Sequence, residues 1–283
     1  MAAKTPEIDE ATRKKEYLAL FEIFSRLIDS TSGSEEQWDI LEELMDLRAE
    51  FAISHAIKGF GMDYEKAIEL IKGFENLSEE EKGQRDILIA AIDNLVDFAV
   101  AEEYQMCVNI FDKESDDEEN ENGDFTQSVF YKYNYQYAQV ENLDIIYAMA
   151  IAFEISKAKG NTILTYMSQG DERVRPWHLQ YEGFSAPKSD FPAWLIPPIE
   201  NMCRCYLLYD DGPEASERLI NKVLAKSSPE KPDWINPVFE ESVALGGKIF
   251  SSAHRYFQID KRHKKRLKQI AGKVKDKYLK ANG

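Results

Sequence analysis

The chain has 283 residues, 43% of them apolar, so it can build one large domain or two ordinary domains around a real hydrophobic core. Its formal net charge of −16 argues against a general nucleic-acid coat, because neutralising phosphates requires an excess of Lys and Arg. Three cysteines do not make a disulfide framework, and no window approaches 18 uninterrupted apolar residues, so no membrane span is expected.

The first 111 residues predict a helical region. Apolar residues recur there every three to four positions, which predicts helices over residues 8–27, 34–57, 63–74 and 78–111. Ser34 with Gln37 suggests a capping box, and Ser78 followed by three glutamates suggests another helix start. Gly83 is the position where the last of these helices is expected to break.

An acidic linker is predicted over residues 112–128. From Asp112 to Asp124 the residues are almost all acids and amides. Their like charges repel one another, and the segment has little apolar area to bury. The tyrosines at 131, 133, 135 and 137 then alternate with polar residues, which is the period of a strand. Helical spacing follows from Ala138 to Lys157, so a strand over 130–137 should give way to a helix.

Two short β-rich runs, 162–167 and 203–209, are predicted to pair as antiparallel strands. The long proline-containing segment 171–202 forms the excursion between them. A loop of this length is rarely structureless inside a compact domain, so specific contacts should hold it.

This loop and the start of the second run contain most of the chemistry in the chain. The candidate structural or partner-binding residues are Asp171, Glu172, Arg173, Arg175, Pro176, Trp194, Pro197, Pro198, Asn201 and Arg204. In one interpretation the carboxylates and guanidiniums form bidentate pairs that tie the loop to the hairpin. Arg173 and Arg175 lie two apart in an extended segment, so they should point to the same side and could clamp a carboxylate or phosphate.

A structural metal is the second interpretation. His178, Cys203 and Cys205 are the candidate ligands, and Asp171 or His254 could complete the set. Zinc suits such soft and borderline ligands, although two or more residues usually separate paired cysteines in closed zinc sites.

Catalysis is the third interpretation, with His178 as general base oriented by Asp171, or with Glu172 acting on a bound water. The chain carries no G-x-S-x-G or H-E-x-x-H motif and no phosphate-cradling glycine loop. We therefore assign no catalytic residue and expect a protein that is not an enzyme.

The motif order resembles a known family. G-D-E-R-V-R-P-W-H ending at His178 is followed by Gly183, Trp194, a Pro-Pro pair and C-R-C, which closely resembles the signature of the phage Mu minor head protein family, or MuF-type head morphogenesis proteins. Residues 236–239, 246–247, 249–250 and 254–257 are similar to the tail of that family. The likeness covers about residues 137 to 259, and it implies one long helix beginning before Tyr137 in place of the strand.

The resemblance implies a minor head structural protein of a tailed bacteriophage or prophage. Such a virion protein is made in the host bacterial cytoplasm, lies in the capsid interior near the portal, contacts the portal and other head proteins, and assists head morphogenesis and DNA packaging or delivery. The alternative is a toxin or nuclease with the Asp171–His178 motif as its active site, because MuF-type domains are joined to toxin modules. A zinc-stabilised adaptor without a viral role is a third hypothesis.

A basic tail is predicted over residues 261–283. Its candidate contacts to DNA or to an acidic neighbour are Lys261, Arg262, Lys264, Lys265, Arg266 and Lys268. Leu267, Ile270, Val274 and Tyr278 recur at helical spacing, so the tail can form a cationic amphipathic helix whose apolar edge docks on a partner. Its deletion after Asp260 is expected to leave the melting temperature unchanged.

Together these patterns predict an α+β, predominantly helical fold. The expected parts are a helical N-terminal region (1–111), the acidic linker (112–128), a MuF-like domain (129–260) and the basic tail (261–283). In the MuF-like domain, a long helix precedes a small antiparallel β element that holds the proline-containing loop.

Overall fold

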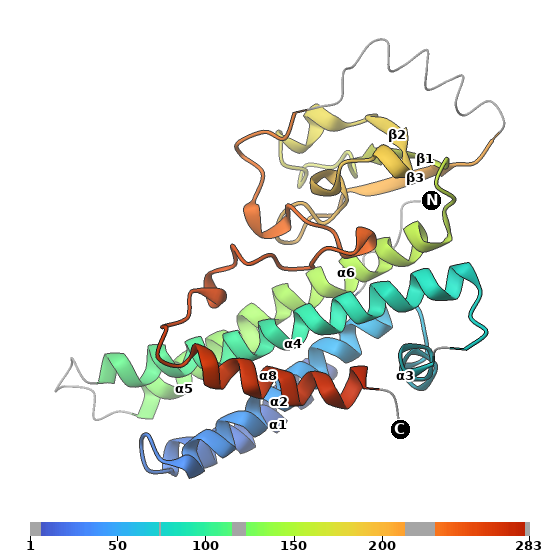
Figure 1. The fold of residues 1–283 in the computed structure, drawn as a ribbon. Helices are drawn as coiled ribbons and strands as arrows, with labels where there is room; N and C mark the ends of the chain where they lie inside the picture. Colours follow the sequence, from blue (N-terminus) through green and yellow to red (C-terminus); the bar gives the residue numbers. More distant parts are fainter. Residues whose placement is uncertain (1–6, 74, 115–122, 213–229, 281–283) are drawn as a thin grey trace.

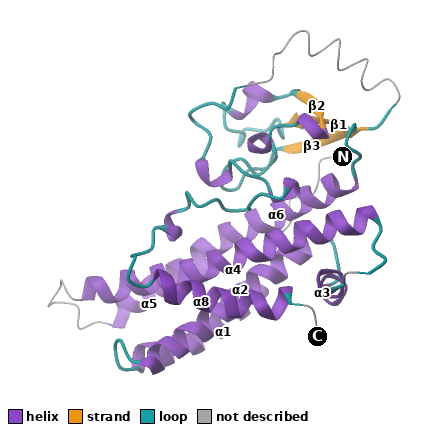
Figure 2. Cartoon of the chain, viewed as in Figure 1, coloured by secondary structure: helices purple, strands orange, loops and turns teal. Residues whose placement is uncertain are grey.

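The chain folds into a body of long helices with a small sheet at one end (Figures 1 and 2). The computed structural model describes residues 7–73, 75–114, 123–212 and 230–280. The α+β, predominantly helical class is confirmed. In these ranges no helix is both long and apolar enough to cross a membrane.

Four helices form the N-terminal region, as predicted: α1 (Glu10–Asp29), α2 (Glu35–Gly59), α3 (Tyr64–Lys72) and α4 (Glu79–Glu114). Ser34 caps α2 by accepting the N–H of Gln37, but the Gln37 side chain accepts from Gly33 rather than from Ser34. The predicted break at Gly83 is wrong, because α4 runs through it without interruption.

The tyrosine-rich segment is helical. It comprises α5 (Gly123–Tyr131), a π-helical turn (Lys132–Tyr137) and α6 (Ala138–Lys157). The predicted strand is therefore wrong, and a helix that begins before Tyr137 is confirmed. Tyr131 stacks on Tyr135 and Tyr133 packs edge-on against Tyr137, with ring centroids 5.0 and 5.5 Å apart. These are i,i+4 contacts along a helical surface.

The acidic linker was predicted too long at both ends. Residues 112–114 belong to α4 and residues 123–128 to α5. The remainder, 115–122, lies outside the described residues.

The sheet is antiparallel, with the strand order β2-β1-β3. Its strands are β1 (Ile163–Met167), β2 (Ser185–Pro187) and β3 (Tyr206–Asp210). The predicted pairing of the two β-rich runs is confirmed, with Tyr166 opposite Leu207. Strand β2 was not predicted, because three residues cannot show an alternation.

The predicted basic tail is part of the body. Helix α8 (Lys264–Leu279) lies along α2, α3 and α4, and its apolar edge, Leu267, Ile270, Val274 and Tyr278, is buried there (Figure 1). On its α2 side, Arg266 pairs with Glu35, Lys273 with Glu42 and Lys277 with Asp46. The expectation that this segment could be removed without loss of stability is therefore wrong, since its apolar residues contribute to the common core.

One hydrophobic cluster runs continuously from α1 through the sheet to α8. Helices α2 and α6 approach so closely that a Cβ atom at Gly59 would lie 2.4 Å from the carbonyl oxygen of Ile146. This close packing fixes α6, and the far end of α6 supports the sheet and the loop beneath it (Figure 1).

Candidate functional site

The two halves of the motif meet beside the sheet. Residues 203–205 lead into β3, and alternation along such an extended segment sends the two cysteine sulfurs to one side and the arginine to the other. Arg204 forms a bidentate pair with Asp171, with both N···O distances 2.8 Å. This pair joins the beginning of the loop to its end and confirms one of the predicted bidentate contacts.

A buried histidine–cysteine cluster lies on the other side of the segment. His178, Cys203 and Cys205 are 2%, 3% and 3% exposed. The Nδ1 atom of His178 is 3.3 Å from Sγ of Cys205 and 3.9 Å from Sγ of Cys203. All three donor atoms lie within 4.8 Å of one another, so this group could bind a metal ion.

Glu200 orients the imidazole. Its Oε2 atom lies 3.2 Å from Nε2 of His178 and 2.9 Å from Nε of Arg175, while Oε1 accepts from the indole of Trp177. A carboxylate at Nε2 favours the tautomer that carries its proton there. The lone pair of Nδ1 is then directed at the two sulfurs.

Side chains from α6 and from the end of β1 fix the backbone around the cysteines. Asp144 accepts the N–H of Met202 at 2.7 Å and holds that residue at a positive φ of 57°. The Tyr147 hydroxyl donates to the carbonyl of Cys205 at 2.6 Å, and Gln169 donates to the carbonyl of Arg204 at 2.9 Å. The cluster therefore rests on three separate hydrogen-bonded supports.

Burial shapes the electrostatics of this cluster. It raises the pKa of the Cys203 thiol and of the Asp144 carboxyl well above their ordinary values. The hydrogen bond from Cys203 lowers the pKa of Cys205. A first negative charge placed here is therefore favoured on Cys205, with the Cys203 thiol donating to it.

The two arginines of the motif do not form one clamp. Arg175 turns to Glu200 and to the carbonyl oxygen of Asn201, 2.8 Å from its Nη2. Arg173 and Glu172 are exposed, and within the described ranges neither side chain forms an ion pair. The expectation of a joint anion clamp is therefore wrong.

The proposed fourth metal ligands lie outside the cluster. Asp171 is engaged by Arg204, and His254 packs between Phe98 and Tyr256. Neither belongs to the group that could hold a metal.

The remaining motif residues shape the loop. Trp194 packs edge-on against Tyr181, with ring centroids 5.4 Å apart. Pro197 and Pro198 are buried and joined by a cis peptide bond, whereas Pro176 is exposed. Trp194 therefore contacts another part of the loop.

The partners of the site were missed at the level of sequence. Asp144 carried a usable signal, since it is a lone acid within the apolar run L-D-I-I-Y-A-M-A of a predicted helix. Glu200 carried none, because nothing in its spacing distinguishes it from a surface glutamate.

A histidine between a thiol and a carboxylate could in principle activate a nucleophile. A cleft of about 380 Å³ lies beside the cluster, and Arg173, Met202 and Cys203 help to line it. The two cysteine residues are nevertheless only 3% exposed, which leaves little of either open to a substrate in this conformation. The geometry suits holding the loop together better than catalysis.

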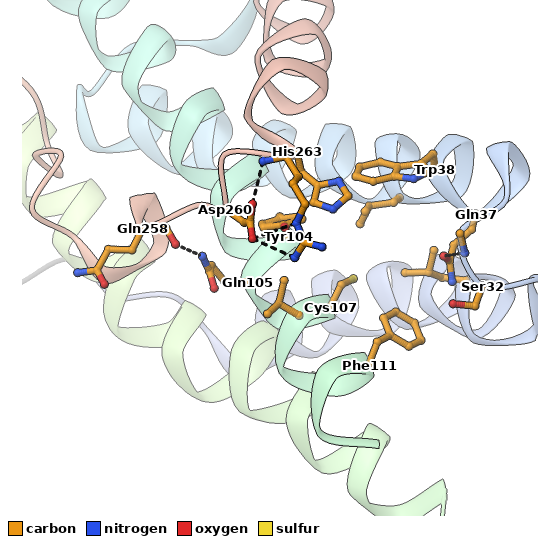
Figure 3. Close-up of a pocket in the computed structure, with 15 residues that line it drawn as sticks. Ser32, Gln37, Trp38, Tyr104, Gln105, Cys107, Phe111, Gln258, Asp260 and His263 are labelled. Atoms are coloured by element: carbon orange, nitrogen blue, oxygen red, sulfur yellow. Dashed lines mark hydrogen bonds and ion pairs between the residues drawn. The ribbon is translucent and has the colours of Figure 1, made fainter. Parts of the chain in front are cut away.

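A second pocket, of about 400 Å³, lies between the turn joining α1 to α2, the end of α4 and the segment before α8 (Figure 3). His263 stacks on Trp38 there with ring centroids 5.4 Å apart, and the Arg266 guanidinium lies 4.4 Å from the centre of the Trp38 ring. Gln105 donates to the carbonyl of Gln258. These contacts anchor the turn before α8. Trp38 and His263 therefore already pack against other residues of the chain.

No known protein family, curated protein or solved structure matched this chain. Its function is therefore inferred from its own residues.

Proposed function

We propose that this chain is a MuF-type minor head protein of a tailed bacteriophage or prophage, situated inside the head near the portal and assisting head morphogenesis. The supporting observation is that the residues carrying the resemblance gather into one unit. Asp171 meets Arg204, and His178 meets Cys205, across 33 and 27 positions of sequence. These two contacts join the beginning of the motif to its end and so keep the module in one shape. A protein that assembles with others needs such a fixed shape.

The surface of this module suits contact with another protein. Trp177, Leu179, Met202 and Leu208 are 38%, 47%, 40% and 45% exposed although they are large and apolar. All four side chains belong to the loop and sheet between residues 177 and 208, and exposed apolar side chains of this size are available to a partner protein. We infer that the portal or another head protein covers them.

We further propose that His178, Cys203 and Cys205 provide three of the four ligands of a structural zinc ion, the fourth position remaining open among the described residues. A tetrahedral site with ordinary Zn–S and Zn–N bonds places its nitrogen and sulfur about 3.6 Å apart. The two N···S distances, 3.3 and 3.9 Å, lie on either side of this value. Glu200 on the far nitrogen is the outer carboxylate that zinc-bound histidines commonly have. The bound ion would fasten the loop to the strand.

The head assignment is tested by mass spectrometry of particles from the phage or prophage that encodes the chain. Immature heads, mature heads and the unassembled fraction should be analysed separately. We expect its peptides in at least one class of head at a fixed ratio to the portal protein. Their confinement to the unassembled fraction would contradict the proposal.

Zinc is tested on protein purified without chelator. We expect about one zinc per chain, and a chelator should lower the melting temperature, because metal binding contributes folding energy. Cys203→Ser and Cys205→Ser should abolish both effects, whereas Cys107→Ala should retain them, since Cys107 is a buried cysteine of the helical body. Wild-type protein that contains no metal, and whose melting temperature the chelator does not change, would contradict the zinc proposal. The cluster would then be held by hydrogen bonds alone, and the proposed head role would be unaffected.

A further inference from the structure

A cleft of about 680 Å³ lies between α4, α8 and the segment 248–259. Apolar side chains form its floor: Val100, Phe257, Ile259, Leu267 and Ala271. Charged residues line its rim: Lys248, Lys264, Lys268 and Lys275, and one acid, Asp97, which pairs with Lys275. We propose that this α4–α8 cleft binds an acidic, amphipathic helical segment of a partner protein. The inference does not depend on the head role or on zinc.

The charge of the rim is the first argument. The other basic residues of α8 are largely neutralised within the chain, and Lys275 lies 2.8 Å from both Asp93 and Asp97. Lys264 and Lys268 are exposed and have no ion-pair partner in the part of the chain that is described. On a chain of net charge −16, two unpaired lysines beside an apolar floor form a local site for carboxylates.

The apolar floor is the second argument, and it favours a peptide over DNA. A phosphate backbone offers nothing to bury against Phe257 and Ile259, and the net negative charge of the chain opposes a polyanion. An amphipathic helix instead carries apolar side chains every three to four residues with carboxylates beside them. Such a helix matches both the floor and the rim.

Gly272 supplies the third argument. It lies in the middle of α8 and lines the cleft, and a Cβ atom added there would meet no atom within 4 Å. The space beside Gly272 therefore belongs to the cleft, and only a large side chain at this position would fill it.

The test is fluorescence anisotropy on the full-length protein with a labelled synthetic 18-residue helix that carries leucines along one face and glutamates elsewhere. A scrambled peptide of the same composition and a labelled DNA duplex serve as competing probes. The double variant Lys264→Glu/Lys268→Glu reverses the rim, and Gly272→Phe fills the cleft. Lys265→Glu is a single charge-reversal control on the same helix outside the cleft, and Gly272→Ala leaves the cleft open.

We expect the amphipathic helix to bind more tightly than the scrambled peptide. The double variant and Gly272→Phe should each weaken binding at least ~10-fold, with melting temperatures close to that of the parent, while both controls bind like the parent. Equal affinity for the scrambled peptide, or unchanged binding by the double variant, would overturn the proposal. Tighter binding of the duplex through the same two lysines would overturn it in favour of DNA.

Discussion

Glu103 should make the helical body less stable as the pH rises. It lies in a buried cluster in which Arg48 pairs with Glu102 at 2.8 Å and with Glu141 at 3.5 Å. Glu103 is fully buried beside them, its nearest donor is Asn134 at 3.4 Å, and its second oxygen has no hydrogen-bond partner among the described residues. Burial, and then the charge of Glu102, raise the pKa of Glu103 to about 8.

The sign and size of the effect follow from proton linkage. Between the ordinary pKa of 4.5 and the folded value of about 8, the folded chain keeps a proton on Glu103 that the unfolded chain has lost. The free energy of unfolding therefore falls with pH by about 1.4 kcal/mol per unit across this window, or about 2–3 kcal/mol from pH 6 to pH 8. Glu103→Gln keeps the neutral shape and removes this loss.

The assay is urea unfolding followed by circular dichroism at pH 5, 6, 7, 8 and 9. Because other groups also titrate, the quantity of interest is the stability of Glu103→Gln minus that of the parent at each pH. It should rise by about 2–3 kcal/mol between pH 6 and pH 8 and then level off. The exposed Glu22→Gln serves as the control and should give no such rise. A difference independent of pH would refute the reasoning, because Glu103 would then be charged in the folded protein.

Three further outcomes follow from the packing. Arg175→Ala should lower the free energy of unfolding by about 1–2 kcal/mol by chemical denaturation, since it leaves the mostly buried Glu200 without its cation, and Arg175→Lys should restore little. Truncation after Asp260 should lower the melting temperature by more than ~10 °C, because it removes five buried apolar side chains. Gly59→Ala should destabilise by more than about 2 kcal/mol, whereas Gly83→Ala, with open space around it, should stabilise by about 0.5–1 kcal/mol.

The helices were predictable because each carries its own periodicity, and the tyrosine segment shows where that signal becomes ambiguous. Tyr131, Tyr133, Tyr135 and Tyr137 alternate as a strand requires, yet the first and third, and the second and fourth, are also i,i+4 pairs. Four residues at a spacing of two fit both patterns. Tertiary packing favours the helix over the strand, since Tyr17 on α1 contacts both Tyr131 and Tyr135.

The part of the candidate site that could be predicted from the sequence is the set of side chains able to bind a metal. His178, Cys203 and Cys205 could be grouped because few other side chains bind soft metals. The sequence marks Asp144 only as an acid in an apolar run, and it does not mark Glu200 at all, because the contacts through which both act are tertiary. The buried supports make the cluster rigid, so they matter as much for its geometry as the three donors do.

Charge in the C-terminal segment was visible in the sequence, but its neutralisation was not. Arg266, Lys273 and Lys277 meet acids of α2 that lie 231 positions earlier in each case, a constant offset that aligns the two helices in parallel. A count of basic residues therefore overstates what this helix can offer to a polyanion. Only lysines left unpaired can gain from a new acidic partner, because a paired lysine must first give up its existing carboxylate. An acidic partner can therefore bind α8 on the side that bears Lys264, Lys265 and Lys268. Of these three lysines, Lys264 and Lys268 border the apolar floor of the cleft.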